Sequence, residues 1–226
     1  MFYYDYYSLV LLLPLIVFSF IIQAILNSTY GKYSKINNSR SISGAEAAKQ
    51  ILSNAGINDV SVECIGGNLT DHFDPTKKAV RLSTDVFNGT SVAAIGIAAH
   101  EVGHAIQHNV GYLPIKIRSS VVGITNFSSR ILYFLIVLSF ISGIPAICDF
   151  AVLCFAIIFF FQLITLPVEF NASARAIKNI KTLDFSSSDL SGVKKVLSSA
   201  AMTYVAAMLV SLAQMVSFIL RSRNRR

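Results

Sequence analysis

Four long apolar stretches divide the chain, at residues 8–26, 131–147, 150–168 and 200–220. Each has about the twenty residues that an α-helix needs to cross the roughly 30 Å hydrocarbon layer of a bilayer. Only Cys148-Asp149 separates the second stretch from the third, so we expect these two to form a helical hairpin whose outer ends return to the same side. The pattern predicts a mainly α-helical integral membrane protein, organised as a single domain over residues 1–226.

The polar segment 27–130 carries the patterns of a small α+β subdomain. Ser43 and Glu46 have the spacing of a capping box, which predicts that a helix starts here. Apolar and polar residues alternate from Val60 to Cys64, as in a strand with one buried face. A second strand is predicted from Ala79 to Ser83.

One helix of this segment carries candidate chemistry. Ser91 can cap an apolar helix that ends near His108. His100 and His104 lie one turn apart on the same face of that helix, so both imidazoles can bind one zinc ion. Glu101 projects beside them, where its carboxylate can take a proton from a zinc-bound water. The pattern HExxH thus predicts two ligands and a general base; the alternative is two structural histidines beside a surface glutamate.

Other histidine and acidic residues are further candidates for ligands. His108 lies eight residues after His100, about 12 Å further along the helix axis and about 80° around it, so the two cannot share an ion. A structural or supporting role is expected for His108. Asp71, His72 and Asp74 are either further ligands or turn residues, and we favour turn residues because Asx side chains form turns.

A catalytic zinc ion normally has three protein ligands and an open position for water. Glu169 is the candidate for the third ligand, because the predicted hairpin brings its end of the third apolar stretch to the side that holds His100. Ser173 follows Glu169 by one turn, where its hydroxyl can orient a ligand. The alternative for Glu169 is an acid at the membrane boundary that balances Arg175.

Composition supports membrane insertion, since 54% of the 226 residues are hydrophobic and the mean hydropathy is +0.59. The net charge of +7 does not indicate nucleic-acid binding, because the basic residues flank apolar stretches instead of forming one patch. Ten of the nineteen Lys and Arg residues lie in 27–130 and five in 169–199, which predicts a cytoplasmic zinc side. Four arginines after the last apolar stretch, Arg221, Arg223, Arg225 and Arg226, oppose this orientation unless the last helix does not fully cross. Three cysteines without a CxxC pair argue against a disulfide framework.

Two further segments bear on membrane attachment. Residues 8–26 have neither a positive n-region nor an A-x-A cleavage site, so we expect an uncleaved anchor rather than a removed signal peptide. Residues 115–129 mix Lys116 and Arg118 with apolar residues and are expected to lie along the membrane surface before the next crossing.

With these motifs, the chain resembles the YugP-type neutral zinc metallopeptidases, a family of small bacterial membrane proteins. The resemblance covers nearly the whole chain and rests on the runs AAHEVGHAIQH, LTDHFDP followed by VRLS, TLPVEFNASARA and AAMTYVAA. It implies a zinc-dependent peptidase of gluzincin type in the bacterial cell membrane. His100, His104 and Glu169 would be its ligands, and Glu101 its base. In better-known gluzincins an aspartate stands where this chain has Ser173, and there it braces a histidine.

We therefore expect a multi-pass, membrane-anchored metalloendopeptidase that hydrolyses membrane or misfolded proteins without a covalent intermediate. Glu101 would accept the proton of the attacking water and pass it to the leaving amine. Arg175 and His108 are candidate donors to the oxyanion. Two alternatives remain open. The first is an intramembrane-cleaving protease, which the apolar run Val92–Ala99 would suit. The second is a non-catalytic membrane scaffold or metal-binding adaptor, although such a protein would have no need of Glu101.

Overall fold

The structure is a computed structural model that describes residues 2–142 and 144–223. Its elements, in chain order, are α1 (Phe2–Tyr33), α2 (Gly44–Asn54), β1 (Ser61–Ile65), β2 (His72–Asp74), β3 (Ala79–Ser83), α3 (Thr84–Asn88), α4 (Val92–Asn109), α5 (Leu113–Ser142), α6 (Pro145–Lys181) and α7 (Ser187–Arg223). They divide into two compact units. The helical unit comprises Met1–Gln23, Lys116–Pro167 and Met202–Arg226, and the sheet-bearing unit comprises Ala24–Ile115 and Val168–Ala201.

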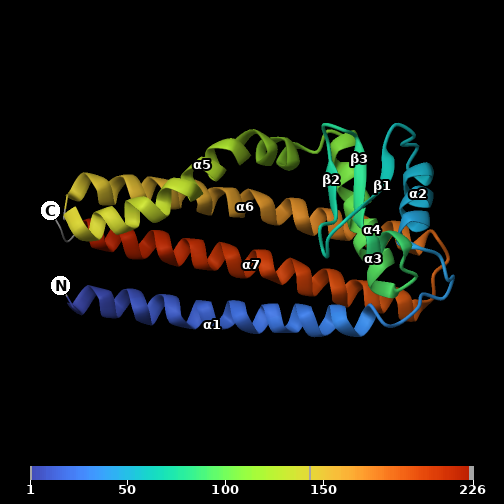
Figure 1. Cartoon of the computed structure of the whole chain (residues 1–226), viewed down its shortest axis with the longest axis horizontal. Helices are drawn as coiled ribbons and strands as arrows, with labels where there is room; N and C mark the ends of the chain where they lie inside the picture. Colours follow the sequence, from blue (N-terminus) through green and yellow to red (C-terminus); the bar gives the residue numbers. More distant parts are fainter. Residues whose placement is uncertain (1, 143, 224–226) are drawn as a thin grey trace. The chain divides into compact units, whose positions relative to one another are not determined.

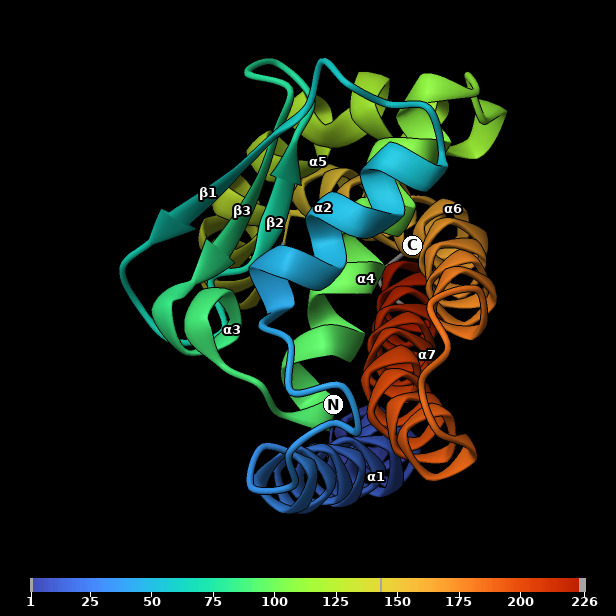
Figure 2. The same ribbon diagram turned by 90° about the vertical axis from the view of Figure 1, so that its right-hand side faces the viewer.

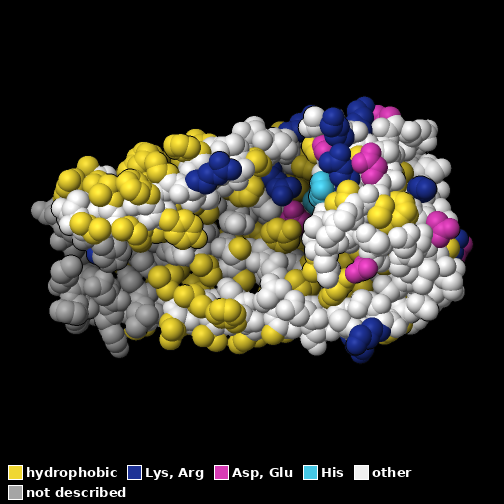
Figure 3. All heavy atoms as spheres, viewed as in Figure 1, with side chains coloured by type: hydrophobic (Ala, Val, Ile, Leu, Met, Phe, Trp, Pro, Cys, Tyr) yellow, Lys and Arg dark blue, Asp and Glu magenta, His cyan; other side chains and the backbone are white. Residues whose placement is uncertain are grey.

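In the helical unit, parts of α1, α5, α6 and α7 run beside one another (Figure 1). A small core joins three of these helices, in which Leu135 of α5 and Phe155 of α6 are buried and Phe218 of α7 packs against them. Many other large apolar side chains of this unit are exposed, and groups of hydrophobic side chains lie on the face seen in Figure 3. Tyr133 and Ile141, for example, are 78% and 79% exposed. All four helices are long and apolar enough to cross a membrane.

The break between the second and third apolar stretches lies earlier than expected. α5 ends at Ser142 and α6 begins at Pro145, so the predicted break at Cys148-Asp149 is wrong. Proline is favoured at the first position of a helix because its missing N–H needs no partner there. Asp149 lies inside α6 and accepts a hydrogen bond from the Ser222 hydroxyl of α7. Residues 115–129 are not a separate helix but the first half of α5.

The described part of α7 ends at Arg223. Arg225 and Arg226, which oppose the predicted orientation, lie outside the described residues.

The sheet-bearing unit has a three-stranded sheet of order β1-β3-β2, with β1 parallel and β2 antiparallel to β3. α2 and α4 pack against it (Figure 2). α2 starts with the predicted capping box, in which the Glu46 amide donates to the Ser43 hydroxyl and the Ser43 amide donates to the Glu46 carboxylate. Strand β3 has the predicted bounds, and β1 is shifted by one residue from the prediction.

α4 is the central helix of this unit. Its first turn is capped by the Ser91 hydroxyl, which accepts from the Ala94 amide at 3.1 Å, as the sequence predicted. Residues on all sides of the helix are buried, and Val80 and Leu82 of β3 belong to the same core. Burial on every side explains why the first half of α4 is apolar all round.

Candidate metal centre

Two imidazoles of α4 face the same direction. His100 and His104 are separated by one helical turn, and their ring centroids lie 4.8 Å apart with the planes nearly perpendicular. His104 is buried and His100 is half-buried. Because α4 is held on all sides by the core, both rings are carried by a rigid element.

α6 supplies a carboxylate to this pair. Glu169 is 3% exposed, and its Oε2 lies 3.2 Å from His100 Nε2 and 3.6 Å from His104 Nε2. Among the described residues, these three form the one group of His, Cys, Asp or Glu side chains whose candidate ligand atoms all lie within 4.8 Å of one another. The structure therefore brings together the three side chains that the sequence proposed as ligands.

The donor set and its spacing suit zinc. Two imidazole nitrogens and one carboxylate oxygen are a common ligand set for catalytic zinc. With bonds of about 2.0–2.1 Å, tetrahedral ligands lie roughly 3.3 Å from one another. The separations of 3.2 Å and 3.6 Å between Glu169 and the two histidines are close to this value. All three candidate ligand atoms lie within 4.8 Å of one another, so the group could close around a single ion.

The electrostatics of the centre favour positive charge. Burial by itself disfavours a charged His104 imidazole, but the hydrogen bond to Glu169 and the nearby carboxylate of Glu101 outweigh burial and raise the pKa of His104. The carboxylates of Glu101 and Glu169 therefore attract a cation, either a proton or a metal ion, to the imidazole of His104.

A close contact between two helices lets the carboxylate reach the imidazoles. Gly103 of α4 lies against the backbone of α6, and a Cβ atom at this position would be only 2.6 Å from the carbonyl oxygen of Ala172. Any larger residue would push the helices apart. Gly103 sits next to His104, and Ala172 lies one turn after Val168 and next to Ser173, so the contact sets the distance between the two halves of the centre.

Gln107 is a residue of this centre that the sequence analysis missed. Its side chain is completely buried and its Oε1 lies 3.0 Å from His104 Nδ1. Its Nε2 donates to the Val168 carbonyl at 2.7 Å and to Asn171 Oδ1 at 3.0 Å, which fixes the orientation of the amide. Oε1 must therefore accept from His104, which places a proton on Nδ1. In a neutral, metal-bound imidazole this would leave the Nε2 lone pair for the ion.

The predicted supporting residues lie at different distances from the centre. Ser173 Oγ is 3.2 Å from His100 Nδ1, which agrees with the predicted contact to a ligand. Arg175 donates through Nε to Asn171 at 2.7 Å and so joins the hydrogen bonds around Gln107. His108 is exposed at the end of α4 and packs its ring on Phe73, with 5.8 Å between the centroids.

The acidic segment before β3 has a structural role. The Asp71 carboxylate accepts from the amide and hydroxyl of Ser83, and Asp74 accepts from the Thr76 and Lys77 amides. These backbone bonds lower the pKa of Asp74. His72 and Asp74 also belong to β2, a three-residue strand that the sequence did not predict. The favoured interpretation as turn residues agrees with the bonds of Asp74 to the turn that follows it and is wrong for His72, which pairs with Arg81 in the sheet.

Comparison with known proteins places the chain in a defined group. The profile of a family described as "Putative neutral zinc metallopeptidase" matches residues 8–223. A protein of Bacillus subtilis (strain 168), named "Putative membrane protease YugP", is 44% identical over 209 residues, which cover 92% of this chain and 93% of that protein. No solved structure matches the chain.

Proposed function

The chain belongs to the family described as "Putative neutral zinc metallopeptidase", and on this basis we propose that it is a membrane-anchored, zinc-dependent metalloendopeptidase. The observation that carries the proposal is the cluster of His100, His104 and Glu169 beside Glu101. The first three side chains would hold the ion. The fourth adds a carboxylate that a site made only for binding does not need.

Each side chain has a separate task in this proposal. Zinc bound to the three ligands would supply a Lewis acid and would lower the pKa of a bound water to about 7. Glu101 accepts a proton from the attacking water and delivers it to the leaving amine. Gln107 and Ser173 hold the two imidazoles through Nδ1, which leaves each Nε2 free to face the ion. Arg175 and His108 remain candidates for contact with the oxyanion.

Four long apolar helices support membrane attachment, and we propose that they cross the bilayer. Two segments, 27–130 and 169–199, hold ten and five of the nineteen Lys and Arg residues, which favours a cytoplasmic zinc centre. Substrates would be proteins or peptides at the membrane, among them membrane or misfolded proteins. The apolar run at the start of α4 is explained by burial in the sheet-bearing unit, which favours cleavage outside the bilayer over cleavage within it.

The deciding experiment compares the wild type with Glu101→Gln, both purified in nanodiscs. Zinc per chain is measured by elemental analysis, and cleavage is measured with unfolded casein. We expect one zinc ion in both proteins and a loss of cleavage of about 100-fold or more in the variant, because a general base contributes roughly 10²–10⁴-fold. Glu63→Gln is the matched control, since Glu63 is an exposed carboxylate bonded to Arg81.

Three results would contradict the proposal. Full cleavage by Glu101→Gln would remove Glu101 as the base. A wild type that binds zinc but does not cleave would favour the metal-binding adaptor. A wild type that holds no zinc would exclude both.

A further inference from the structure

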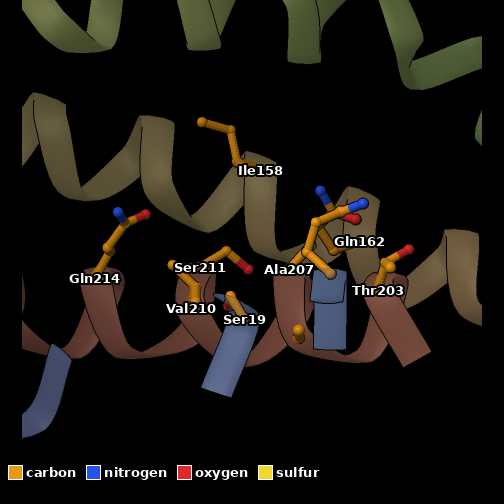
Figure 4. Close-up of a pocket in the computed structure, with 10 residues that line it drawn as sticks. Ser19, Ile158, Gln162, Thr203, Ala207, Val210, Ser211 and Gln214 are labelled. Atoms are coloured by element: carbon orange, nitrogen blue, oxygen red, sulfur yellow. The ribbon is translucent and has the colours of Figure 1, made fainter. Parts of the chain in front are cut away.

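A pocket of about 350 Å³ lies within the helical unit, between α1, α6 and α7 (Figure 4). More than half of its lining side chains are polar, although these helices are otherwise apolar. None of the lining side chains is charged. The polar ones are Ser19, Gln23, Gln162, Thr203, Ser211 and Gln214.

Two carboxamides in this pocket are unusual for a membrane helix. The hydroxyls of Ser19 and Ser211 donate to carbonyl groups of their own helices at 2.8 Å, which satisfies them locally. Gln162 and Gln214, in contrast, make no hydrogen bond to any described residue. An amide without a partner is costly in a bilayer, where no water replaces the missing bond. Both side chains are half-buried and line the pocket, so a polar ligand in the pocket would reach them and supply the partners.

The pocket exists because one face of α7 carries small side chains. Thr203, Ala207 and Ser211 recur every four residues and so share a face, on which Gln214 follows one turn later. Ala207 in particular leaves room that a leucine would fill. The volume falls within the range of ligand-binding pockets, roughly 300–1,000 Å³.

The position and chemistry of the pocket limit what can bind. From Thr203 to Gln214 the polar face extends about 16 Å along α7, about half of the roughly 30 Å hydrocarbon layer. Gln214 would thus lie deeper than the ester groups of lipids, and acyl chains offer no hydrogen bonds. The absence of charged lining residues argues against an ion. A carboxamide both donates and accepts, which suits an uncharged polar side chain carried into the bilayer by another helix.

We propose that this pocket binds an Asn, Gln, Ser or Thr side chain of a transmembrane helix from another protein. The inference rests on the proposed membrane insertion, and under the proposed function that helix belongs to the substrate. Gln162 and Gln214 form hydrogen bonds to the incoming side chain, and the small residues of α7 admit it. The pocket would then select membrane proteins whose helices carry exposed polar residues.

Binding can be measured without zinc or cleavage. The full chain, labelled with a donor dye, is reconstituted in phosphatidylcholine vesicles. Two acceptor-labelled probes are added at low peptide-to-lipid ratio, a polyleucine transmembrane peptide with one central asparagine and the same peptide without it. We expect the asparagine peptide to associate about tenfold more strongly, the size of one interhelical hydrogen bond.

Substitutions connect this preference to the pocket. Gln162→Leu with Gln214→Leu should abolish it, and folding should persist because two unsatisfied amides are replaced by apolar groups. Ala207→Leu should abolish it by filling the pocket, with both glutamines intact. Phe160→Leu is the control on α6, since Phe160 is 56% exposed and does not line the pocket.

The proposal is overturned if the wild type binds both peptides equally, or if the preference survives in both pocket variants. It is also overturned if energy transfer between two copies of the chain disappears in these variants, because the occupant would then be a second copy. Zinc content and casein cleavage are independent of this readout. Failure of the pocket proposal therefore does not contradict the peptidase proposal, and failure of the peptidase proposal does not contradict the pocket proposal.

Discussion

The contact between Gly103 and α6 gives a prediction that separates ligand geometry from fold stability. In Gly103→Ala, the new Cβ would lie 2.6 Å from the Ala172 carbonyl oxygen and 3.2 Å from the Ala172 Cα. Both neighbours are backbone atoms and cannot rotate away. A normal carbon–oxygen contact is at least about 3.2 Å, so α4 and α6 must separate locally by roughly 0.6 Å or more.

This displacement is large for a metal centre and modest for a fold. Protein–metal bond lengths are held within about 0.2 Å, so moving Glu169 away from the imidazoles should weaken zinc binding about tenfold or more. The stability cost of overpacking is about 1–3 kcal/mol. Replacing a helical glycine by alanine recovers up to about 1 kcal/mol. We therefore expect a clear loss of zinc affinity with a net destabilisation of about 0–2 kcal/mol.

Two other glycines serve as matched controls. Gly96 is also in α4, but its Cβ would be 3.3 Å from a methyl group of Val193, a side chain that can shift. Gly123 in α5 has nothing within 4 Å of the Cβ position, so Gly123→Ala should leave zinc binding unchanged and stabilise the helix slightly. Zinc affinity is measured by competition with a chromogenic chelator, and stability by denaturant unfolding. If Gly103→Ala binds zinc like Gly123→Ala, the close contact does not set the ligand geometry.

Three further predictions address the same centre. Glu169→Ala should reduce bound zinc in elemental analysis, whereas the exposed Glu46→Ala should not; unchanged zinc would exclude Glu169 as a ligand. Gln107→Leu should weaken zinc affinity roughly 10–100-fold, because His104 loses the acceptor that holds its tautomer. Gln50→Leu, at a partly exposed glutamine of α2, is its control. Equal zinc affinity in Gln107→Leu and the wild type would contradict the orienting role of Gln107. In zinc-free protein, the pKa of His104 is raised above its usual 6.5, so its contribution to stability is complete below pH 6.5 and is lost as pH rises through the raised pKa. Denaturant unfolding across pH 6–9 should show this decline in the wild type and not in His104→Gln, and parallel curves would refute it.

Local patterns were sufficient to predict the elements that are stabilised locally. The cap at Ser91 and the capping box at Ser43 depend on neighbours within a few residues, and the local composition of Ala79–Ser83 is enough to predict a strand; the structure has all three. The imidazole pair follows directly from the helical period. The prediction that Glu169 lies beside the two imidazoles required one additional assumption, that the second and third apolar stretches form a hairpin.

Features that depend on distant partners were not predicted. Gln107 bonds to Val168 and Asn171, 61 and 64 residues away, so its only local signal is an amide in an apolar helix three residues after His104. The three-residue strand β2 exists through its pairing with β3. The break before Pro145 was missed because apolar residues continue on both sides of it and hydropathy does not distinguish a turn from a span. The proline itself was the available signal.

The division of the ligands between α4 and α6 has a consequence for biosynthesis. A growing chain that has been made only up to Pro167 has both imidazoles and the proposed base Glu101, yet it lacks the Glu169 carboxylate, the proposed third ligand. Two apolar segments must be synthesised before Glu169 follows. Under the proposed function, cleavage by this centre would therefore begin only after Glu169 has been translated.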